Sequence, residues 1–339
     1  MTDTFNGIPN LDPDSWLAKA FDYVRVRSQL PDNIIFWTLA AFCGASLQDS
    51  IKVDWSVKPI FPNLPLLIVG ESGLGKTGAK NAVSPLFERC LPYKSAEDST
   101  AEAMTRDLAT FGRTRCNNTS GLWIVPELAD VLGSKDYQQG SVARLTRLFD
   151  NPYNYEISRA TSGRITLQGH CVLSWVAGTT FEWVSKHVDE AVSAGGFLPR
   201  LVVIYTKDAR KFVPNPKKDI QIIAQLNAEL IQKLNRDNFQ QRVITLESEW
   251  EAEFRNIFDA GERARGTPRA PFIARRAENT LRIFLILNEF GKIRWNSVEF
   301  GEAEKCAKWF EDQAVALEFD LKFGNSVGGS RRVKAYLSQ

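Results

Sequence analysis

The chain has 339 residues, of which 44% are apolar and 24% are charged. This composition supplies enough apolar material for a sizeable core and excludes a disordered chain, a collagen-like chain and a disulfide-stapled miniprotein. Lys and Arg number 42 against 40 Asp and Glu, a net charge of +2. Any case for nucleic-acid binding must therefore rest on local groups of charge.

Cysteine usage and hydropathy indicate the compartment. The five cysteines include no CxxC pair, and only two histidines accompany them. This pattern favours reduced thiols and disfavours a Cys/His zinc site. The start of the chain lacks the pattern of a signal peptide, and the longest uncharged runs, 33–48 and 165–181, are short for a membrane span. We therefore expect a soluble cytoplasmic protein with no membrane partner.

Residues 1–60 predict an N-terminal, mainly helical segment. Apolar residues at near-helical spacing predict a helix over 15–29, with Asp12 or Asp14 as its cap and Pro13 in its first turn. A second helix, 32–47, is apolar on most sides, which predicts burial. Residues 51–57 alternate like a strand.

Residues 61–212 predict an α/β core. Short apolar runs are typical of strands buried on both faces, and four occur here, at 65–69, 122–125, 171–177 and 201–205. Helical stretches separate them. This order predicts a mostly parallel sheet between layers of helices.

The sequence pattern changes after Tyr205. Residues 213–216 resemble a linker, and the pattern beyond them predicts a helical, lid-like C-terminal domain over 213–323. Its expected helices are 218–235, 246–261, 274–290 and 301–319. Residues 324–339 are expected to form a flexible tail leading to a further domain.

The most specific signal follows the first strand of the core. Eight residues fit G-x-x-x-x-G-K-[ST] at every fixed position, namely Gly70, Glu71, Ser72, Gly73, Leu74, Gly75, Lys76 and Thr77. The glycines permit close approach, and the loop N–H groups and the helix beginning near Gly78 cradle phosphates. Lys76 is predicted to reach the β- and γ-phosphates and the Thr77 hydroxyl to hold Mg²⁺. The predicted cofactors are ATP and Mg²⁺.

The second strand of the core ends in the candidate acid. Glu127 follows the apolar run, but Pro126 stands where an Asp is expected. We predict that Glu127 activates water and contacts the metal. Asp130 either assists the metal or is a solvated acid at a helix start. If Glu127 merely caps a helix, the protein would bind ATP and hydrolyse it poorly.

Two further positions suit nucleotide chemistry. Thr179 or Thr180, at the end of the third strand, is predicted to bond the γ-phosphate or the attacking water, the alternative being a plain turn. Arg200, before the fourth strand, is predicted to reach the γ-phosphate of a neighbouring subunit, the alternative being a surface arginine. The arginine role requires a ring or a filament.

A basic segment lies in the C-terminal part, because residues 263–276 hold five arginines and no acid. Arg275 or Arg276 is predicted to open a helix and to touch nucleotide as a second sensor. The other three, Arg263, Arg265 and Arg269, are predicted to contact nucleic-acid phosphates, the alternative being a solvated loop.

The loop over 133–140 is the other candidate for contact with DNA. Lys135 offers a charge and Tyr137 a stacking surface, and the alternative is an ordinary polar loop. Arg159 and Arg164 flank an expected hairpin turn and are weaker candidates.

Several blocks of sequence together carry a resemblance over roughly 14–320. They are Phe61-Pro62-Asn63-Leu64, the phosphate motif, Val125-Pro126-Glu127-Leu128-Ala129, Ala177-Gly178-Thr179-Thr180-Phe181-Glu182-Trp183, Gly195-Gly196-Phe197-Leu198-Pro199-Arg200 and Ala274-Arg275-Arg276-Ala277-Glu278-Asn279-Thr280-Leu281-Arg282. In these blocks the chain resembles the helicase-like P-loop ATPases of phages, prophages and mobile elements, which are often fused or adjacent to a primase domain.

The resemblance implies a P-loop NTPase core of AAA+ or RecA-like type in a self-assembling ring, a hexamer. Such a protein would be an ATP hydrolase that translocates on or unwinds DNA, single-stranded in our expectation, with a primase as a possible partner. Two alternatives stay open. One is an ATP-switched assembly scaffold on DNA or protein with weak hydrolysis, which the missing Asp favours. The other is a protein-remodelling or defence-associated ATPase, for which Tyr137 would supply an aromatic pore loop.

Overall fold

The computed structural model describes residues 5–55, 58–74, 76–91, 93–97, 99–112, 118–132, 135–159, 163–187, 196–207, 211–214, 217–235, 241–246, 249–292 and 297–323. A few side chains within these ranges, including those of Thr77, Lys135, Tyr137 and Arg159, lie outside the description.

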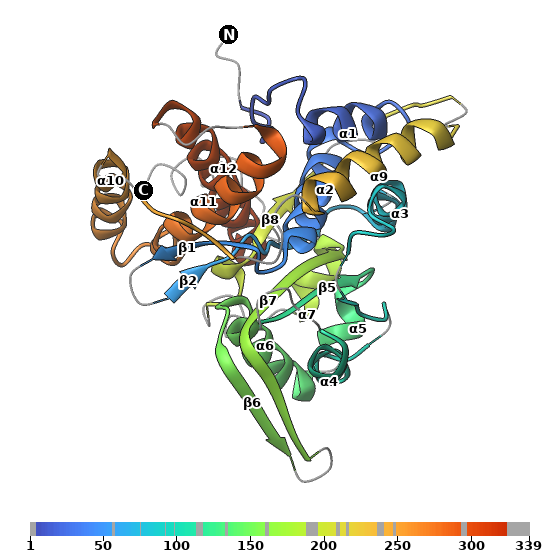
Figure 1. Ribbon diagram of the computed structural model, residues 1–339. Helices are drawn as coiled ribbons and strands as arrows, with labels where there is room; N and C mark the ends of the chain where they lie inside the picture. Colours follow the sequence, from blue (N-terminus) through green and yellow to red (C-terminus); the bar gives the residue numbers. More distant parts are fainter. Residues whose placement is uncertain are drawn as a thin grey trace.

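A parallel sheet forms the centre of the molecule (Figure 1), as the four apolar runs predicted. Its five parallel strands lie in the order β4 (Tyr93–Lys94), β5 (Thr119–Val125), β7 (Gly163–Thr179), β3 (Pro65–Val69) and β8 (Val202–Tyr205). β6 (Tyr153–Arg159) pairs antiparallel with the first half of β7. The two strands form a long hairpin that projects from the body.

Helices connect these strands. They are α3 (Lys76–Val83), the 3₁₀ turn η1 (Ser84–Leu86), α4 (Ala101–Phe111), α5 (Leu128–Leu132), α6 (Lys135–Phe149), α7 (Phe181–His187) and the 3₁₀ turn η2 (Leu198–Arg200). They cross over between parallel strands, as the βαβ arrangement requires.

Strand β3 is buried on both faces, and all five of its residues are buried. Because successive side chains in a strand point to opposite faces, Leu66 and Ile68 join one hydrophobic cluster while Leu67 and Val69 join another. The first cluster contains α1 (Trp16–Arg25), α2 (Asp32–Leu47) and α3; the second contains α4 to α7. The uninterrupted apolar sequence of β3 follows from this position.

The N-terminal helices form close to their predicted places, but the cap of α1 differs from the prediction. Ser15 is the cap, since its hydroxyl accepts a hydrogen bond from the Ala18 N–H at 3.2 Å. Asp12 and Asp14 precede the cap, and the carboxylate of Asp12 accepts the N–H of Asp14. The predicted Asp cap was therefore wrong, and Pro13 lies before the helix.

The C-terminal part contains four helices among the described residues. They are α9 (Ile220–Asn235), α10 (Glu249–Arg263), α11 (Ala270–Gly291) and α12 (Ser297–Phe323). α11 and α12 pack along each other, and α12 also packs against β8 at the edge of the central sheet. The predicted helices are confirmed, with α11 beginning several residues earlier than expected.

The two ends of the chain share one core. β1 (Ile51–Trp55) lies between β2 (Lys58–Ile60), which is antiparallel to it, and β9 (Arg242–Ile244), which is parallel to it. The indole N–H of Trp16 donates to the Leu226 carbonyl at 2.9 Å. The predicted segments 1–60 and 213–323 are thus packed together, a pairing that local sequence patterns do not reveal.

Candidate nucleotide site

The phosphate motif lies at the carboxyl end of β3, in the middle of the sheet. Ligands of open α/β sheets bind at this edge. Gly73 has φ +82°, a conformation that favours glycine. Gly70 is enclosed, because a Cβ there would lie 2.7 Å from the Leu74 side chain and 3.2 Å from the Thr206 carbonyl oxygen. The sequence therefore folds here as a strand, a tight loop and a helix, the arrangement that the motif requires.

Lys76 is the first residue of α3, and its ammonium group folds back over the loop. The Nζ donates to the Gly70 carbonyl at 3.0 Å and to the Glu71 carbonyl at 2.9 Å. Burial lowers the pKa of Lys76, and the negative charges of Glu127 and Glu182 oppose that shift. The lysine is thus held beside the loop, close to two acids.

Glu127 lies at the same edge, just beyond the end of β5, and is exposed. Gly178, near the end of β7, is close to both the residue before Glu127 and Lys76. A Cβ on Gly178 would lie 2.9 Å from the Pro126 carbonyl oxygen and 3.3 Å from Cβ of Lys76. The structure therefore brings the predicted acid to the predicted lysine. Asp130 is exposed in the first turn of α5, and its N–H donates to the Glu127 carbonyl at 3.1 Å.

The two threonines after β7 differ in what they contact. The Thr180 hydroxyl accepts the Trp183 N–H at 3.2 Å and so serves α7 as a cap. Thr179 pairs with Val69 in the sheet, and its carbonyl accepts the Gly70 N–H at 3.3 Å. Its hydroxyl is buried and has no hydrogen-bond partner in the described part of the chain. Since buried hydroxyls are normally bonded, Thr179 is the better candidate to contact a ligand.

A cavity of about 250 Å³ adjoins the loop. Its lining includes Gly70, Glu71, Glu182, Tyr205 and Asp320. The Tyr205 hydroxyl donates to the Asp320 carboxylate at 2.6 Å, and burial is the main cause that raises the pKa of Tyr205. Gly70 and Glu71 belong to the predicted phosphate motif, but sequence reasoning assigned no role to Glu182, Tyr205 or Asp320. Of these three, Glu182 alone offered a signal, as an acid soon after a strand end.

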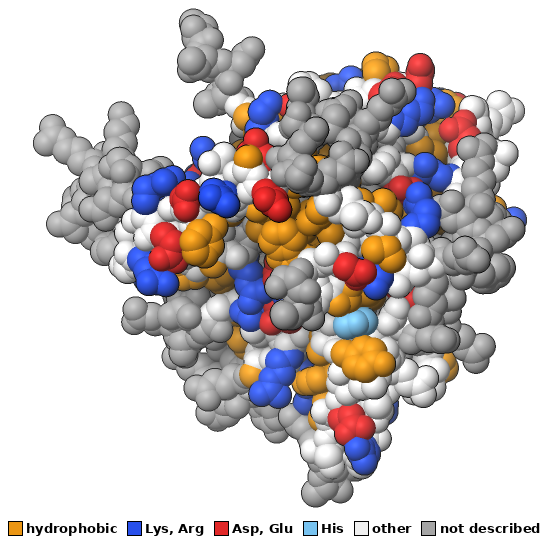
Figure 2. Space-filling model, turned by 60° about the vertical axis from the view of Figure 1, so that its left-hand side comes forward, with side chains coloured by type: hydrophobic (Ala, Val, Ile, Leu, Met, Phe, Trp, Pro, Cys, Tyr) orange, Lys and Arg blue, Asp and Glu red, His pale blue; other side chains and the backbone are white. Residues whose placement is uncertain are grey.

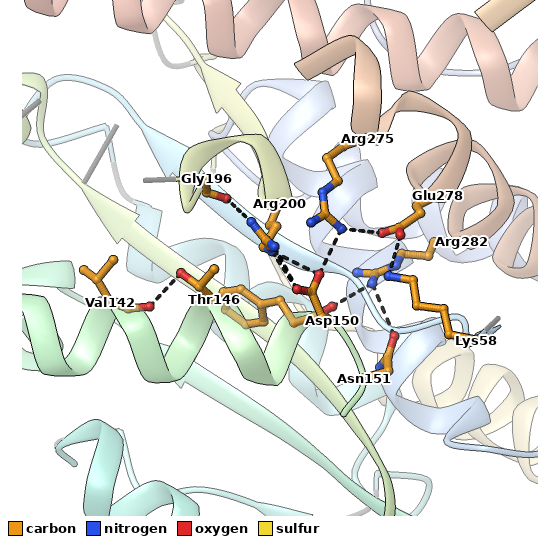
Figure 3. A network of polar contacts seen from close by, with 11 residues as sticks. Lys58, Val142, Thr146, Asp150, Asn151, Gly196, Arg200, Arg275, Glu278 and Arg282 are labelled. Atoms are coloured by element: carbon orange, nitrogen blue, oxygen red, sulfur yellow. Dashed lines mark hydrogen bonds and ion pairs between the residues drawn. The ribbon is translucent and has the colours of Figure 1, made fainter. Parts of the chain in front are cut away.

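Arg200 lies at the other edge of the sheet, at the amino end of β8. The Arg200 guanidinium bonds the Asp150 carboxylate, with Nη2 2.8 Å from Oδ2 (Figure 3). Asn151, the next residue, donates to the Asn63 side chain at 3.1 Å, just before β3 begins. The length of β3, about 13 Å at ~3.3 Å per residue, separates this edge from the phosphate loop.

Arg275 and Arg276 were predicted to touch nucleotide as a second sensor, but the structure does not bring them to the loop. Both lie in the second turn of α11, which they do not open. Arg275 binds Asp150 at 2.9 Å, at the edge opposite the loop. Arg276 pairs with Glu311 of α12 at 2.7 Å, with 9% and 2% of the two side chains exposed. The sensor prediction is corrected on this geometry.

The predicted nucleic-acid contacts are only partly placed. Arg269 is bound to Glu311 and Asp312, so its charge is compensated. Arg265 is 79% exposed and pairs with Glu262, while Arg263 is exposed at the end of α10. On the face in Figure 2, where α10 comes forward, Lys and Arg side chains alternate with Asp and Glu. The predictions on Lys135 and Tyr137 fall on side chains outside the described ones.

Comparison with known proteins adds no assignment. The chain matches no model of a protein family, and no curated protein is significantly similar to it. In the part of the chain that the structure describes, no helix combines the length and apolarity needed to cross a bilayer. The site must therefore be interpreted from its own geometry.

Proposed function

We propose that this protein is an ATP hydrolase with a P-loop NTPase core. The observation that supports this most strongly is the loop over 70–77, which joins the buried central strand β3 to α3 at the carboxyl edge of the sheet. Lys76 and Glu127 lie at this same edge, near enough for the charge of Glu127 to act on the pKa of Lys76. This is the combination that phosphate binding and attack by water require.

The residues present fit the phosphates of ATP. The loop supplies backbone N–H groups, Lys76 supplies the cation, and the unpartnered Thr179 hydroxyl suits a γ-phosphate oxygen or the water beside it. Glu127 and the Thr77 hydroxyl would hold Mg²⁺, which neutralises charge on the phosphates when bound. Glu127 would then accept the proton of the attacking water. The cavity bounded by Tyr205 and Asp320 suits the nucleoside end.

We further propose that the protein works as a homo-oligomeric ring, a hexamer, and moves on single-stranded DNA in the cytoplasm. The placement of Arg200 supports assembly, because at the amino edge it would meet phosphates only of another copy. The projecting hairpin of β6 and β7 supports a second macromolecule, since it extends beyond the body of the molecule (Figure 1). A primase is a further partner that the family resemblance implies.

One observation favours a second candidate function, an assembly scaffold switched by ATP. Pro126 stands where a second carboxylate is expected, and Glu127 is exposed, with no donor to its carboxylate among the residues that the structure describes. A site with one loosely held acid would bind ATP and hydrolyse it slowly. Binding would then change assembly without processive movement.

Steady-state ATP turnover of the wild type and of Glu127→Gln, with and without single-stranded DNA at fixed salt, tests the proposal. Salt must be fixed because phosphate contacts are strongly salt-dependent. We expect DNA to raise wild-type turnover several-fold, and Glu127→Gln to lower turnover by on the order of 10²-fold or more while still binding ATP. Negligible turnover in all conditions, with ATP changing the oligomeric state, would instead favour the scaffold.

A further inference from the structure

A cluster of charges at the amino edge of the sheet centres on Asp150 (Figure 3). Its carboxylate accepts bonds from two arginines of distant segments, Arg200 before β8 and Arg275 in α11, at distances between 2.8 and 3.0 Å. Burial alone would raise the pKa of Asp150, but these two arginines and Lys58 lower it overall. One ionised carboxylate thus holds two guanidinium groups side by side.

Arg200 is fixed on both sides. Its Nε and Nη2 bond Asp150, and its Nη1 donates to the Gly196 carbonyl at 2.7 Å. Gly196 has φ +81°, and a Cβ there would lie 2.7 Å from the same Nη1. A glycine is therefore required at position 196, where the backbone passes close to the Arg200 guanidinium.

Arg275 retains capacity to bind a ligand. Both hydrogen bonds of the Arg275 side chain are donated by Nη1, to Asp150 at 2.9 Å and to Glu278 at 3.0 Å. Among the described residues, Nε and Nη2 of Arg275 have no hydrogen-bond partner, and 21% of the side chain is exposed. A guanidinium presents its N–H groups as a planar fork that matches two phosphate oxygens.

The cluster carries more positive than negative charge. Its cations are Lys58, Arg200, Arg275 and Arg282, and its acids are Asp150 and Glu278. Arg282 is 2% exposed, and its Nε has no partner within the described chain. Uncompensated charge is costly in such a setting. A dianionic phosphate group would balance the excess of two positive charges.

We infer that Arg200 and Arg275, positioned by Asp150, form a two-arginine site for the terminal phosphate of a nucleotide held by a neighbouring copy. The inference rests on the proposed function and extends it, because Arg275 acts between subunits rather than on its own nucleotide. The geometry requires the second copy, since the loop of the same chain lies at the opposite edge of β3. Asp150 is a positioning residue, and the arginines contact the substrate.

Mixing two inactive variants tests this inference. Lys76→Ala keeps the arginines and loses the phosphate site, whereas Arg275→Gln keeps the phosphate site and loses one arginine. We expect Arg275→Gln alone to bind ATP normally and to turn it over on the order of 10³-fold more slowly. In an equimolar mixture, turnover should return to about a quarter of the wild-type rate, because head-to-tail interfaces pair an intact loop with intact arginines at that frequency.

A second variant tests for misfolding, and a control tests for a general effect of removing an arginine. Asp150→Asn should keep its ATP affinity, lose turnover and regain it on mixing with Lys76→Ala, a recovery that a misfolded chain would not show. Arg106→Gln, in which a 54% exposed arginine of α4 is removed, should leave turnover unchanged.

The outcomes separate the inference from the proposed function. If the wild type turns over ATP but the mixtures stay inactive, Arg275 acts within its own chain or only in packing, and the inference is overturned. If Arg275→Gln weakens DNA binding and leaves turnover without DNA unchanged, the phosphate belongs to nucleic acid, and the inference is again overturned. If the wild type neither binds nor hydrolyses ATP, the proposed function falls, and the inference with it.

Discussion

Replacing Lys76 with alanine is expected to lower ATP turnover by on the order of 10²–10³-fold. The Lys76 ammonium lies 2.9–3.0 Å from two loop carbonyls, beside the Glu127 acid and at the start of α3. No other lysine in the described chain bonds the loop carbonyls, so its charge has no substitute there. Steady-state phosphate release from ATP measures the effect.

Lys52→Ala is the control, because Lys52 lies on β1 and pairs with Asp54 at 2.9 Å. We expect its turnover to match the wild type. Equal turnover by Lys76→Ala and the wild type would show that the loop over 70–77 is a structural turn rather than a phosphate site.

Replacing Glu311 with alanine is expected to lower the free energy of unfolding by about 3–5 kcal/mol. Only 2% of the Glu311 side chain is exposed, and its two oxygens bind different arginines, Oε1 to Arg269 and Oε2 to Arg276. These bonds join α11 and the turn before it to α12. Removing the acid leaves the buried Arg276 with only the distant carboxylate of Glu304, at 3.9 Å, while Arg269 keeps the exposed Asp312. Urea denaturation followed by circular dichroism measures the change.

Asp312→Ala provides the matched comparison on the same helix. The Asp312 side chain is 47% exposed and bonds only the outer arginine, Arg269. Exposed ion pairs contribute about 0–1 kcal/mol, so this variant should unfold close to the wild type. Equal losses in the two variants would contradict the assignment of the buried pair as the main stabilising contact between α11 and α12.

The sequence predicted those elements that depend mainly on residues close together in the chain. The run over 65–69 has no polar residue and forms the strand buried on both faces. The apolar stretch at 32–47 forms a buried helix with those bounds. The glycines of the phosphate motif predicted a tight turn, and the apolar run before it and the helical stretch after it predicted that this turn lies at a strand end. The position of Glu127 at the same edge was likewise predictable, because it comes two residues after the buried strand β5.

The sequence could not predict contacts between distant segments. The arginines over 263–276 suggested a basic surface because no acid lies among them, yet Glu311 and Asp312 of α12 neutralise Arg269. Arg275 was assigned to nucleotide from its place in the chain, whereas its partner is Asp150, 125 residues earlier. The pairing of β1 with β9 depends in the same way on tertiary packing. Such partners are set by topology, which local periodicity does not encode.

The most direct test of the nucleotide site is a calorimetric titration of the wild type with ATP in the presence of Mg²⁺, beside the same titration of Lys76→Ala. The account predicts one nucleotide per chain for the wild type and binding weakened at least about tenfold in the variant, because a charge-assisted phosphate contact is worth about 1.5–3 kcal/mol. No binding by the wild type, or equal affinity in the two proteins, would contradict it.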